Sequence, residues 1–357
     1  KQKVEIDSIE ALRDYSAKSG YAVRMKPGVY KVDSTLPDDP KTVFRFSGSN
    51  NYFDLRGVTI QIDTRMLANM PRTKAHQLGV YRIGGSHLTF RGAVFENVGN
   101  HAPQRSLTDF SASGDDVTFD DCRFIVRGSA PYGYGDLYGK GRNSAVRLQK
   151  HSCLAVSGDR CLIENCDFVI HSFGHGIHMH GADDTVIRNV TMQGKLRLTD
   201  ELYEESSGPA AKYDYKMMFP PWKKGQPIPK GKMLSLTEDG IRAYSHTGHI
   251  TVENCTIKRM RGGITIGQAS GAKVTDCTVL DSGGHAYSLP SNGIVRNCRG
   301  NAAYAPLLTI PYRNRRNADI ELELLESEQP LGNHPLATVV GSGHRIAIDY
   351  VGEGKPE

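Results

Sequence analysis

Three histidines lie within six positions of the stretch GHGIHMHG, at residues 174–181. If this stretch is a strand, His178 and His180 point to the same side of it, because side chains alternate along a strand. They could share a metal ion with Asp183 or Asp184, which follow shortly after. Zinc sites, however, usually need a third protein ligand with defined geometry. We therefore predict no metal site here and expect the histidines to act on a substrate.

A second stretch with chemical potential is TEDGIRAYSHTGH, at residues 237–249. A guanidinium such as that of Arg242 can bind a carboxylate through two parallel hydrogen bonds. Histidine and tyrosine side chains can serve as general acid or base when neighbouring charges tune them. The residues predicted to be catalytic are Arg242, Tyr244, His178, His180 and His246.

Composition limits the kind of protein that carries these residues. The chain has 357 residues, of which 38% are hydrophobic and 23% charged, as in a soluble globular protein. No run approaches 18 apolar residues, so we predict no membrane span. The formal charge of +5 suits a polyanionic partner, and we expect no nucleic acid partner. The 38 glycines recur between short β-branched runs, which indicates many short strands and tight turns.

A recurring hexad supplies the architecture. Its copies are FDDCRF (119–124), IENCDF (163–168), IRNVTM (187–192), VENCTI (252–257), VTDCTV (274–279) and VRNCRG (295–300), with weaker ones at 55–60 and 90–95. The spacing of about 22 residues and the alternation of apolar with polar residues predict a solenoid with one such strand per repeat. We predict an all-β protein: a right-handed parallel β-helix of roughly ten coils spanning residues 1–357 as a single domain. Residues 8–15, with Ser8 as N-cap, predict an N-terminal capping helix.

Each hexad follows a second short strand by ten to twelve residues, and GHGIHMHG contains one of these strands. With a period of two, Ile177 and Met179 face the core, and so do Ile241 and Ala243 on the next coil. The opposite face should therefore form one outward row. Its predicted members are His178, His180, Arg242, Tyr244 and Tyr287, with His285 at its edge and His246 on the following turn.

Five cysteines occupy one position of the hexad, and we predict that they stack inward as small apolar residues. They are Cys122, Cys166, Cys255, Cys277 and Cys298. Zinc or disulfide roles are less favoured because the sequence has no C-x-x-C pair. Cys153 and Cys161 lie outside this ladder, and whether they pair stays open.

Two segments interrupt the repeat on either side of the histidine coil. Residues 195–236 form a long insertion that contains Trp222, and residues 128–150 are rich in tyrosine, glycine and basic side chains. Long loops on a compact scaffold are usually functional, so we predict that residues 195–236 cover the outward row. The predicted substrate-binding residues are Tyr287, His285, Arg147, Lys150, Trp222, Lys230, Lys232 and Arg261.

The N-terminal sequence IEALRDYSAKSGYAVRMKPGVYKVD and the hexads resemble those of secreted β-helix carbohydrate-active enzymes, most of all the polysaccharide lyases of the alginate and chondroitin lyase type. Many of those enzymes use a lysine base and an arginine on successive coils. This chain has no strand lysine one coil away from Arg242, so a lysine from the insertion, such as Lys230 or Lys232, would have to serve. The stretches 174–177 and 238–255 are also faintly similar to polygalacturonase motifs.

The resemblance implies a secreted or periplasmic lyase that cleaves an acidic, uronic-acid-containing glycan such as alginate by β-elimination. The partner would be an acidic polysaccharide or oligosaccharide, with no cofactor required; calcium is possible but has no clear motif. One alternative is a β-helix glycoside hydrolase that uses Glu238 or Asp239, since hydrolysis needs a carboxyl pair. Another is a non-catalytic glycan-binding solenoid. The identity of the sugar and the oligomeric state stay open.

Overall fold

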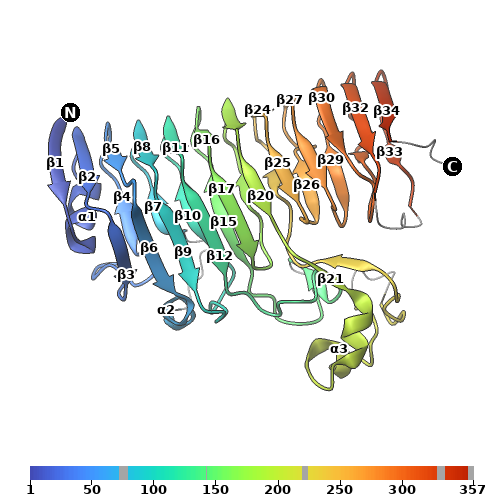
Figure 1. Cartoon of the computed structure of the whole chain (residues 1–357), viewed down its shortest axis with the longest axis horizontal. Coiled ribbons are helices and arrows are strands. Elements are labelled where there is room, and N and C mark those ends of the chain that lie inside the picture. Colours follow the sequence, from blue (N-terminus) through green and yellow to red (C-terminus); the bar gives the residue numbers. More distant parts are fainter. Residues whose placement is uncertain (72–78, 142, 219–223, 328–333, 353–357) are drawn as a thin grey trace.

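The computed structural model describes residues 1–71, 79–141, 143–218, 224–327 and 334–352. These residues form a right-handed parallel β-helix, as the repeat predicts, with coils stacked from the N-terminal to the C-terminal end (Figure 1). One face is a sheet of ten strands, which agrees with the predicted number of coils. In order along the solenoid these are β4 (Phe44–Phe46), β7 (Gly79–Ile83), β10 (Leu107–Ala112), β15 (His151–Val156), β18 (Ile177–Met179), β23 (Ile241–Ala243), β26 (Gly262–Thr265), β29 (His285–Ser288), β31 (Leu308–Ile310) and β33 (Ala337–Val339).

Two further ladders of parallel strands merge at β30 into the second large sheet. The first ladder contains β1 (Gln2–Ile6), β2 (Tyr21–Met25), β5 (Tyr52–Asp54), β8 (Leu88–Arg91), β11 (Val117–Asp120), β16 (Leu162–Glu164), β19 (Thr185–Arg188), β24 (His249–Glu253), β27 (Gly271–Thr275), β30 (Ile294–Gly300), β32 (Asp319–Leu325) and β34 (Arg345–Val351). The second contains β3 (Gly28–Val32), β6 (Val58–Asp63), β9 (Val94–Val98), β12 (Arg123–Arg127), β17 (Asp167–His171), β20 (Thr191–Gln193), β25 (Thr256–Lys258) and β28 (Thr278–Leu280). Every coil in the middle of the solenoid therefore contributes three strands.

The hexads differ from the prediction in one respect, because most of them bend between the two ladders and do not form one strand. The third residue of every copy has a positive φ, between 48° and 77°. These residues are Gly57, Gly92, Asp121, Asn165, Asn189, Asn254, Asp276 and Asn297. Glycine, asparagine and aspartate are the residues that adopt this left-handed conformation most readily. The Asn/Asp–Cys pair is thus the corner of each coil, where the polar residue turns the chain and the cysteine fills the corner from inside.

The five ladder cysteines are buried in the hydrophobic core, which confirms the predicted inward stack. Their thiols are free, and so are those of Cys153 and Cys161, which are buried separately and form no disulfide. At the N-terminal end, helix α1 (Ile9–Ser16) packs Ile9 and Leu12 onto the same core. The Ser8 hydroxyl accepts a hydrogen bond from the Ala11 N–H, so the predicted N-cap is confirmed.

The long insertion leaves the solenoid between β20 and β23 and projects from its side, where Figure 1 shows α3. Its stem is an antiparallel pair, β21 (Leu196–Leu198) and β22 (Met233–Ser235). Its outer part carries the 3₁₀-helix η1 (Thr199–Glu204) and α3 (Gly208–Lys212). The shorter excursion at 128–150 contains the small hairpin β13 (Gly139–Lys140) and β14 (Asn143–Ser144). A further helix, α2 (Thr64–Asn69), lies near the N-terminal end.

The two excursions share a second hydrophobic core, separate from that of the coils. Its buried members are Tyr134, Leu137 and Tyr138 from the shorter excursion, and Leu202, Ala210, Met217 and Ile228 from the insertion. Burial of this apolar surface holds the two excursions together, because apolar side chains gain free energy when they leave water. In the described part of the chain, no helix is long and apolar enough to cross a membrane.

Candidate active site

The outward row of the ten-strand sheet runs directly through the predicted site. In the strand register His178 lies beside Arg242, and Arg242 lies beside Thr265 on the next coil. The following member is Ser288, which pairs with Thr265. The histidine coil and the arginine coil are therefore neighbours, as predicted, although the long insertion separates them in the sequence.

Tyr287 is not a member of this row, and its predicted outward orientation is wrong. It aligns with the inward Ile264, and its side chain is 0% exposed. The phenol donates a hydrogen bond to the backbone carbonyl of Arg299 at 2.8 Å, with that of Cys277 also within 3.1 Å. A buried tyrosine is stable when its hydroxyl finds such a partner. Tyr287 is therefore part of the core and cannot contact a substrate.

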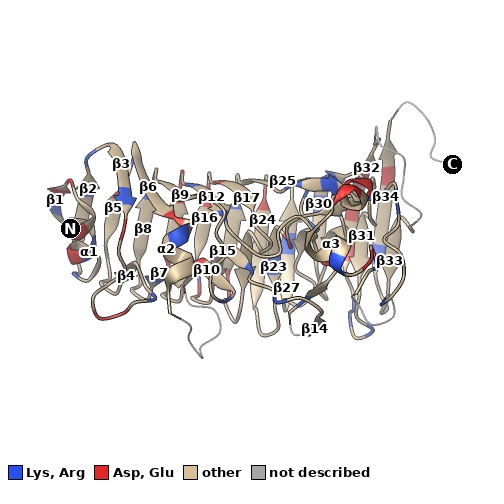
Figure 2. Cartoon of the chain, turned by 90° about the horizontal axis from the view of Figure 1, so that it is seen from below, with Lys and Arg blue, Asp and Glu red and all other residues tan. Residues whose placement is uncertain are grey.

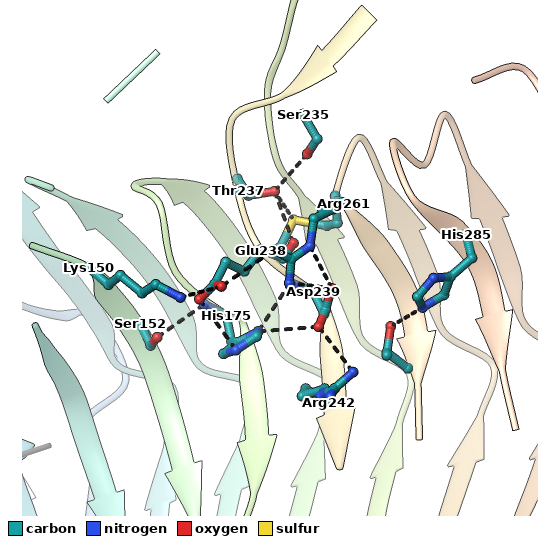
Figure 3. A network of polar contacts seen from close by, with 12 residues as sticks. Lys150, Ser152, His175, Ser235, Thr237, Glu238, Asp239, Arg242, Arg261 and His285 are labelled. Atoms are coloured by element: carbon teal, nitrogen blue, oxygen red, sulfur yellow. Dashed lines mark hydrogen bonds and ion pairs between the residues drawn. The ribbon is translucent and has the colours of Figure 1, made fainter. Parts of the chain in front are cut away.

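Two consecutive carboxylates form the floor of the site just before β23. Glu238 and Asp239 are 3% and 2% exposed, and both are held by cations. Lys150 Nζ lies 2.5 Å from Glu238 Oε1, and Arg261 Nη2 lies 3.1 Å from Asp239 Oδ1 (Figure 3). Arg261 also approaches Glu238 at 3.5 Å. Lys150 and Arg261, both predicted to bind substrate, thus lie at the site and neutralise its buried anions.

This pairing fixes the ionisation of both carboxyl groups. Burial alone raises the pKa of Glu238, but the neighbouring His175 ring and the Lys150 and Arg261 cations outweigh burial and lower it from 4.5 to about 2. The pKa of Asp239 is also lowered against the effect of burial, chiefly by Arg261. Opposite charges at this range favour the ionised form. Both groups are therefore carboxylates at neutral pH.

His175 connects this floor to Tyr244. The backbone N–H of Asp239 donates to His175 Nδ1 at 3.1 Å, so this nitrogen is an acceptor and the proton of the neutral ring is on Nε2. His175 Nε2 then donates to the Tyr244 hydroxyl at 2.8 Å, with Glu238 Oε2 at 3.4 Å. Burial lowers the pKa of His175, which favours the neutral ring. The tyrosine oxygen accepts from His175, so its own proton is free to point elsewhere.

Aromatic and cationic groups surround Tyr244 on the outward face. The His180 ring stacks on it at 4.3 Å between centroids and 9° between planes, and the Arg242 guanidinium lies 4.9 Å from its ring centroid. Burial raises the pKa of Tyr244 to about 12. His178 lies beneath, buried, and neither ring nitrogen has a hydrogen-bond partner among the described residues. Desolvation lowers its pKa, so the buried His178 ring is neutral at pH 7.

The two carboxylates, Arg242 and Tyr244 line a cavity of about 530 Å³, whereas the predicted His178 and His180 are not among its lining residues. One side of the cavity is formed by the charged and polar residues Lys150, Glu238, Asp239, Arg242, Tyr244 and Arg261. The other lining residues come from three segments: the shorter excursion (Asp136, Lys140 and Gly141), the insertion (Met233, Leu234 and Ser235) and the segment that leads into β29 (Gly283, Gly284 and His285). The insertion thus contributes to the site through its stem. Lys140 has a lowered pKa because of partial burial and the nearby charge of Arg261.

The remaining predicted residues lie outside this cavity. His246 is exposed on the turn after β23. Arg147 donates to the backbone carbonyl of Gln104, and Lys230 lies over the ring of Tyr203 in the insertion. The exposed Lys232 uses its backbone to bind Thr199. Trp222 lies outside the described residues. Neither Lys230 nor Lys232 lines the cavity; the lysines that do so are Lys140 and Lys150, both from the shorter excursion.

Two site residues escaped the sequence-based prediction. His175 lies on the turn before the strand, and the signal for it is its position in GHG, three residues before His178. Lys140 sits in a glycine-rich excursion, and nothing in the sequence indicates which lysine the chain folds back onto the coils. His285, by contrast, lines the cavity as expected and contacts Thr265 Oγ1 through Nε2 at 2.9 Å.

The ring nitrogens of the three clustered histidines do not converge on a common metal position within the described residues. The group there that could hold an ion is Asp183, Asp184 and His249, which has two exposed members. Its members lie on the turn after β18 and at the first residue of β24, and they are not among the residues that line the cavity.

Comparisons with known proteins agree with this architecture. A sequence model for right-handed beta helix regions matches residues 233–315. Three solved structures share the fold over nearly the whole chain. An endo-xylogalacturonan hydrolase from Aspergillus tubingensis has a TM-score of 0.54 at 11% identity, covering 98% of this chain and 93% of that one. A rhamnogalacturonan lyase has a TM-score of 0.56 at 12% identity, covering 95% of this chain and 81% of that one, and a mannuronic acid specific polysaccharide family 6 lyase from human gut microbiota has a TM-score of 0.52 at 11% identity, covering 98% and 83%. A search of curated protein sequences finds no match. At these identities the likeness shows the fold alone.

Proposed function

We propose that the chain is a polysaccharide lyase that cleaves a uronic-acid-containing glycan by β-elimination. The observation that carries the proposal is the pairing of a carboxylate-binding arginine with a hydrogen-bonded tyrosine above two ionised carboxylates. The structural neighbours, which include lyases and a hydrolase acting on acidic glycans by their printed names, support the substrate class. A secreted or periplasmic location fits such a polymeric substrate and belongs to the same proposal.

Arg242 is suited to bind the uronate carboxylate. It reaches Asp239 Oδ2 only at 3.6 Å, which is longer than a hydrogen bond, so its donors remain available to a carboxylate that enters the cavity. Stacking on Tyr244 holds the guanidinium in place. Binding the carboxylate there stabilises the negative charge that develops on the sugar as the C5 proton leaves.

Tyr244 is suited to donate the proton to the leaving oxygen. Its hydroxyl accepts from His175, which orients the phenolic proton away from His175, and a pKa of about 12 keeps the group protonated at neutral pH. A general acid must be protonated and within hydrogen-bond reach of the leaving group. The His175 N–H would also stabilise the tyrosinate after the transfer.

Lys140 is the cavity residue whose properties fit the base. Its pKa is lowered, so a larger fraction of its amine is neutral and able to accept a proton than in an exposed lysine. It comes from the excursion that faces the coil of Arg242 across the cavity. In the proposed reaction Lys140 takes the C5 proton, the C4–O4 bond breaks, a C4–C5 double bond forms, and O4 takes the proton of Tyr244.

Hydrolysis through Glu238 and Asp239 is disfavoured by their ionisation. A glycosidase pair needs one carboxyl group that stays protonated and so has a raised pKa. Here the pKa values of both groups are lowered, and both are buried in ion pairs. Asp109, on β10, is buried with its Oδ1 atom 2.8 Å from His151 Nε2. No described carboxyl group of the cavity floor is therefore prepared to act as an acid.

The product distinguishes the proposals. Purified chain would be incubated with a panel of acidic polysaccharides, and both ultraviolet absorbance and reducing ends would be followed. Elimination yields an unsaturated, absorbing end for each new reducing end, and this one-to-one ratio is the expected result. Reducing ends without absorbance would overturn the lyase proposal in favour of hydrolysis. Tight binding with neither signal would support a glycan-binding solenoid.

A further inference from the structure

The loop that follows β31 carries a cluster of arginines beside an exposed tyrosine. Its sequence, PYRNRR, spans residues 311–316, and Tyr312 is 36% exposed. Arg313 and Arg316 are exposed, and Arg315 is half-buried with its guanidinium 5.0 Å from the Tyr312 ring centroid. Among the described residues, none of these three arginines lies within ion-pair distance of a carboxylate. Figure 2 shows basic segments in loops near β31 and β33.

This loop follows β31, which lies three strands from β23, the strand of Arg242, toward the C-terminal end of the ten-strand sheet. The register runs from Arg242 through Thr265 and Ser288 to Thr309 on β31, so the outward row continues as hydroxyl groups beyond the arginine. Three strand spacings correspond to about 14 Å. The strand positions between Arg242 and the loop therefore carry small hydroxyl side chains, of which Thr265 and Ser288 are buried.

The tyrosine bridges most of that distance. Gln268, on the coil next to that of Tyr244, donates a hydrogen bond to the Tyr312 hydroxyl at 2.7 Å. The ring thus reaches back over the intervening coil toward the cavity, and it is held between Gln268 at one end and Arg315 over its face.

Hydrogen bonds also fix the loop backbone to both neighbouring coils. The Arg316 N–H donates to Ser291 Oγ at 3.1 Å, and the Ser342 N–H donates to the Arg315 carbonyl at 3.2 Å. Within the loop, the Arg316 guanidinium donates to the carbonyls of Arg313 and Arg315. A surface that is already ordered loses little entropy when it binds a ligand.

We propose that Tyr312, Arg313, Arg315 and Arg316 form a second binding surface for an acidic glycan, which takes the part of a long chain that extends beyond the cavity. The guanidinium groups would bind its carboxylates, and the flat ring would contact the apolar face of a sugar. The inference rests on the proposed function for the identity of the ligand as an acidic glycan, and it adds that binding depends on chain length.

The test measures binding by calorimetry with turnover suppressed, in the 357-residue chain carrying Tyr244→Phe. The probes are polymannuronate, polyguluronate and polygalacturonate, each as a polymer and as a trisaccharide, with dextran as the uncharged control. Two variants alter the surface: Tyr312→Ala, and Arg313→Gln with Arg315→Gln. The matched control, Arg24→Gln with Lys31→Gln, removes two exposed charges from the N-terminal coils.

We expect each surface variant to bind the preferred polymer about two- to fivefold more weakly for each side chain replaced, with trisaccharide affinity unchanged. The arginine variant should also show a weaker dependence on salt, because exposed charges are screened. Polymer affinity equal to that of the control variant would overturn the proposal, as would failure of the parent protein to bind any acidic polymer. If the surface variants lose polymer affinity but the wild-type chain cleaves none of the polymers, the surface stands and the lyase proposal fails.

Discussion

Replacing Glu238 by glutamine tests whether the buried charges of the site form one stabilising network. Lowering the pKa of this carboxyl from 4.5 to about 2 corresponds to about 3 kcal/mol of unfolding free energy, since a tenfold change in proton affinity is worth about 1.4 kcal/mol. Glu238→Gln removes this contribution and leaves Lys150 without its 2.5 Å partner. We expect the free energy of unfolding at pH 7 to fall by about 3 kcal/mol, in the range seen when one partner of a buried pair is removed.

The pH dependence has a defined sign. Because the pKa of Glu238 is lower in the folded state, its contribution is complete above pH 4.5 and disappears as the pH falls toward 2. Urea denaturation followed by circular dichroism should therefore show the gap between wild type and variant closing over this window. The exposed Glu323→Gln serves as control and should change stability little at any pH. A gap under about 1 kcal/mol at pH 7, or one that is unchanged at pH 2.5, would refute the reasoning.

Three further predictions concern catalysis and use the turnover assay on the preferred polymer. Arg242→Ala should lower kcat/KM by about 10²–10³, and Arg242→Lys should recover little of it because an ammonium lacks the planar fork; full activity in the lysine variant would contradict bidentate binding. Tyr244→Phe should lower kcat by about 10²–10⁴ with little change in substrate affinity, as measured by calorimetry; an unchanged kcat would exclude it as the acid. Deletion of residues 199–232, with a short turn joining β21 to β22 and with Leu137 and Tyr138 replaced by serine to limit the apolar surface left exposed, should abolish turnover, because the excursion that carries Lys140 loses the core that it shares with the insertion. The circular dichroism of the coils should be preserved, since solenoid coils are stabilised by their neighbours; undiminished turnover would contradict this role of the insertion.

The coils could be predicted because their chemistry is local and repeated. Each Asn–Cys corner combines a residue that tolerates positive φ with a small apolar one, so the period is visible without any knowledge of distant contacts. That the hexad bends at its third residue could also have been inferred, since Gly57 and Gly92 occupy the same place as Asn165. The alternation of apolar and polar residues predicts the spacing of the strands, and the bend becomes evident only when the residue types at the third position are compared.

Tyr287 shows where alternation fails. In the sequence AYSL both Ala286 and Tyr287 are compatible with the core, so the pattern alone does not decide which of the two alternating sets of side chains points inward. The decision rests on the alignment of Tyr287 with Ile264 and on the backbone carbonyls of Cys277 and Arg299. Such partners become visible only when the coils are stacked.

The lysines show a second limit. Lys230 and Lys232 are the candidates that sequence favours, because the insertion lies next to the arginine coil along the chain. The cavity instead receives Lys140 and Lys150 from the earlier excursion. How far a loop folds back depends on its tertiary packing, and no periodic signal in the sequence reports that packing.

The hydrophobic core shared by the two excursions has a consequence for protein engineering. Leu137 and Tyr138 on one segment are buried together with Leu202 and Met217 on the other, so each segment keeps apolar side chains of the other away from water. If only one of the two segments were transferred to another β-helix to change its specificity, its apolar side chains would be exposed to water, and the protein would tend to aggregate. The unit that can be transferred is therefore the excursion at 128–150 together with the insertion at 195–236, although the two are separate in the sequence.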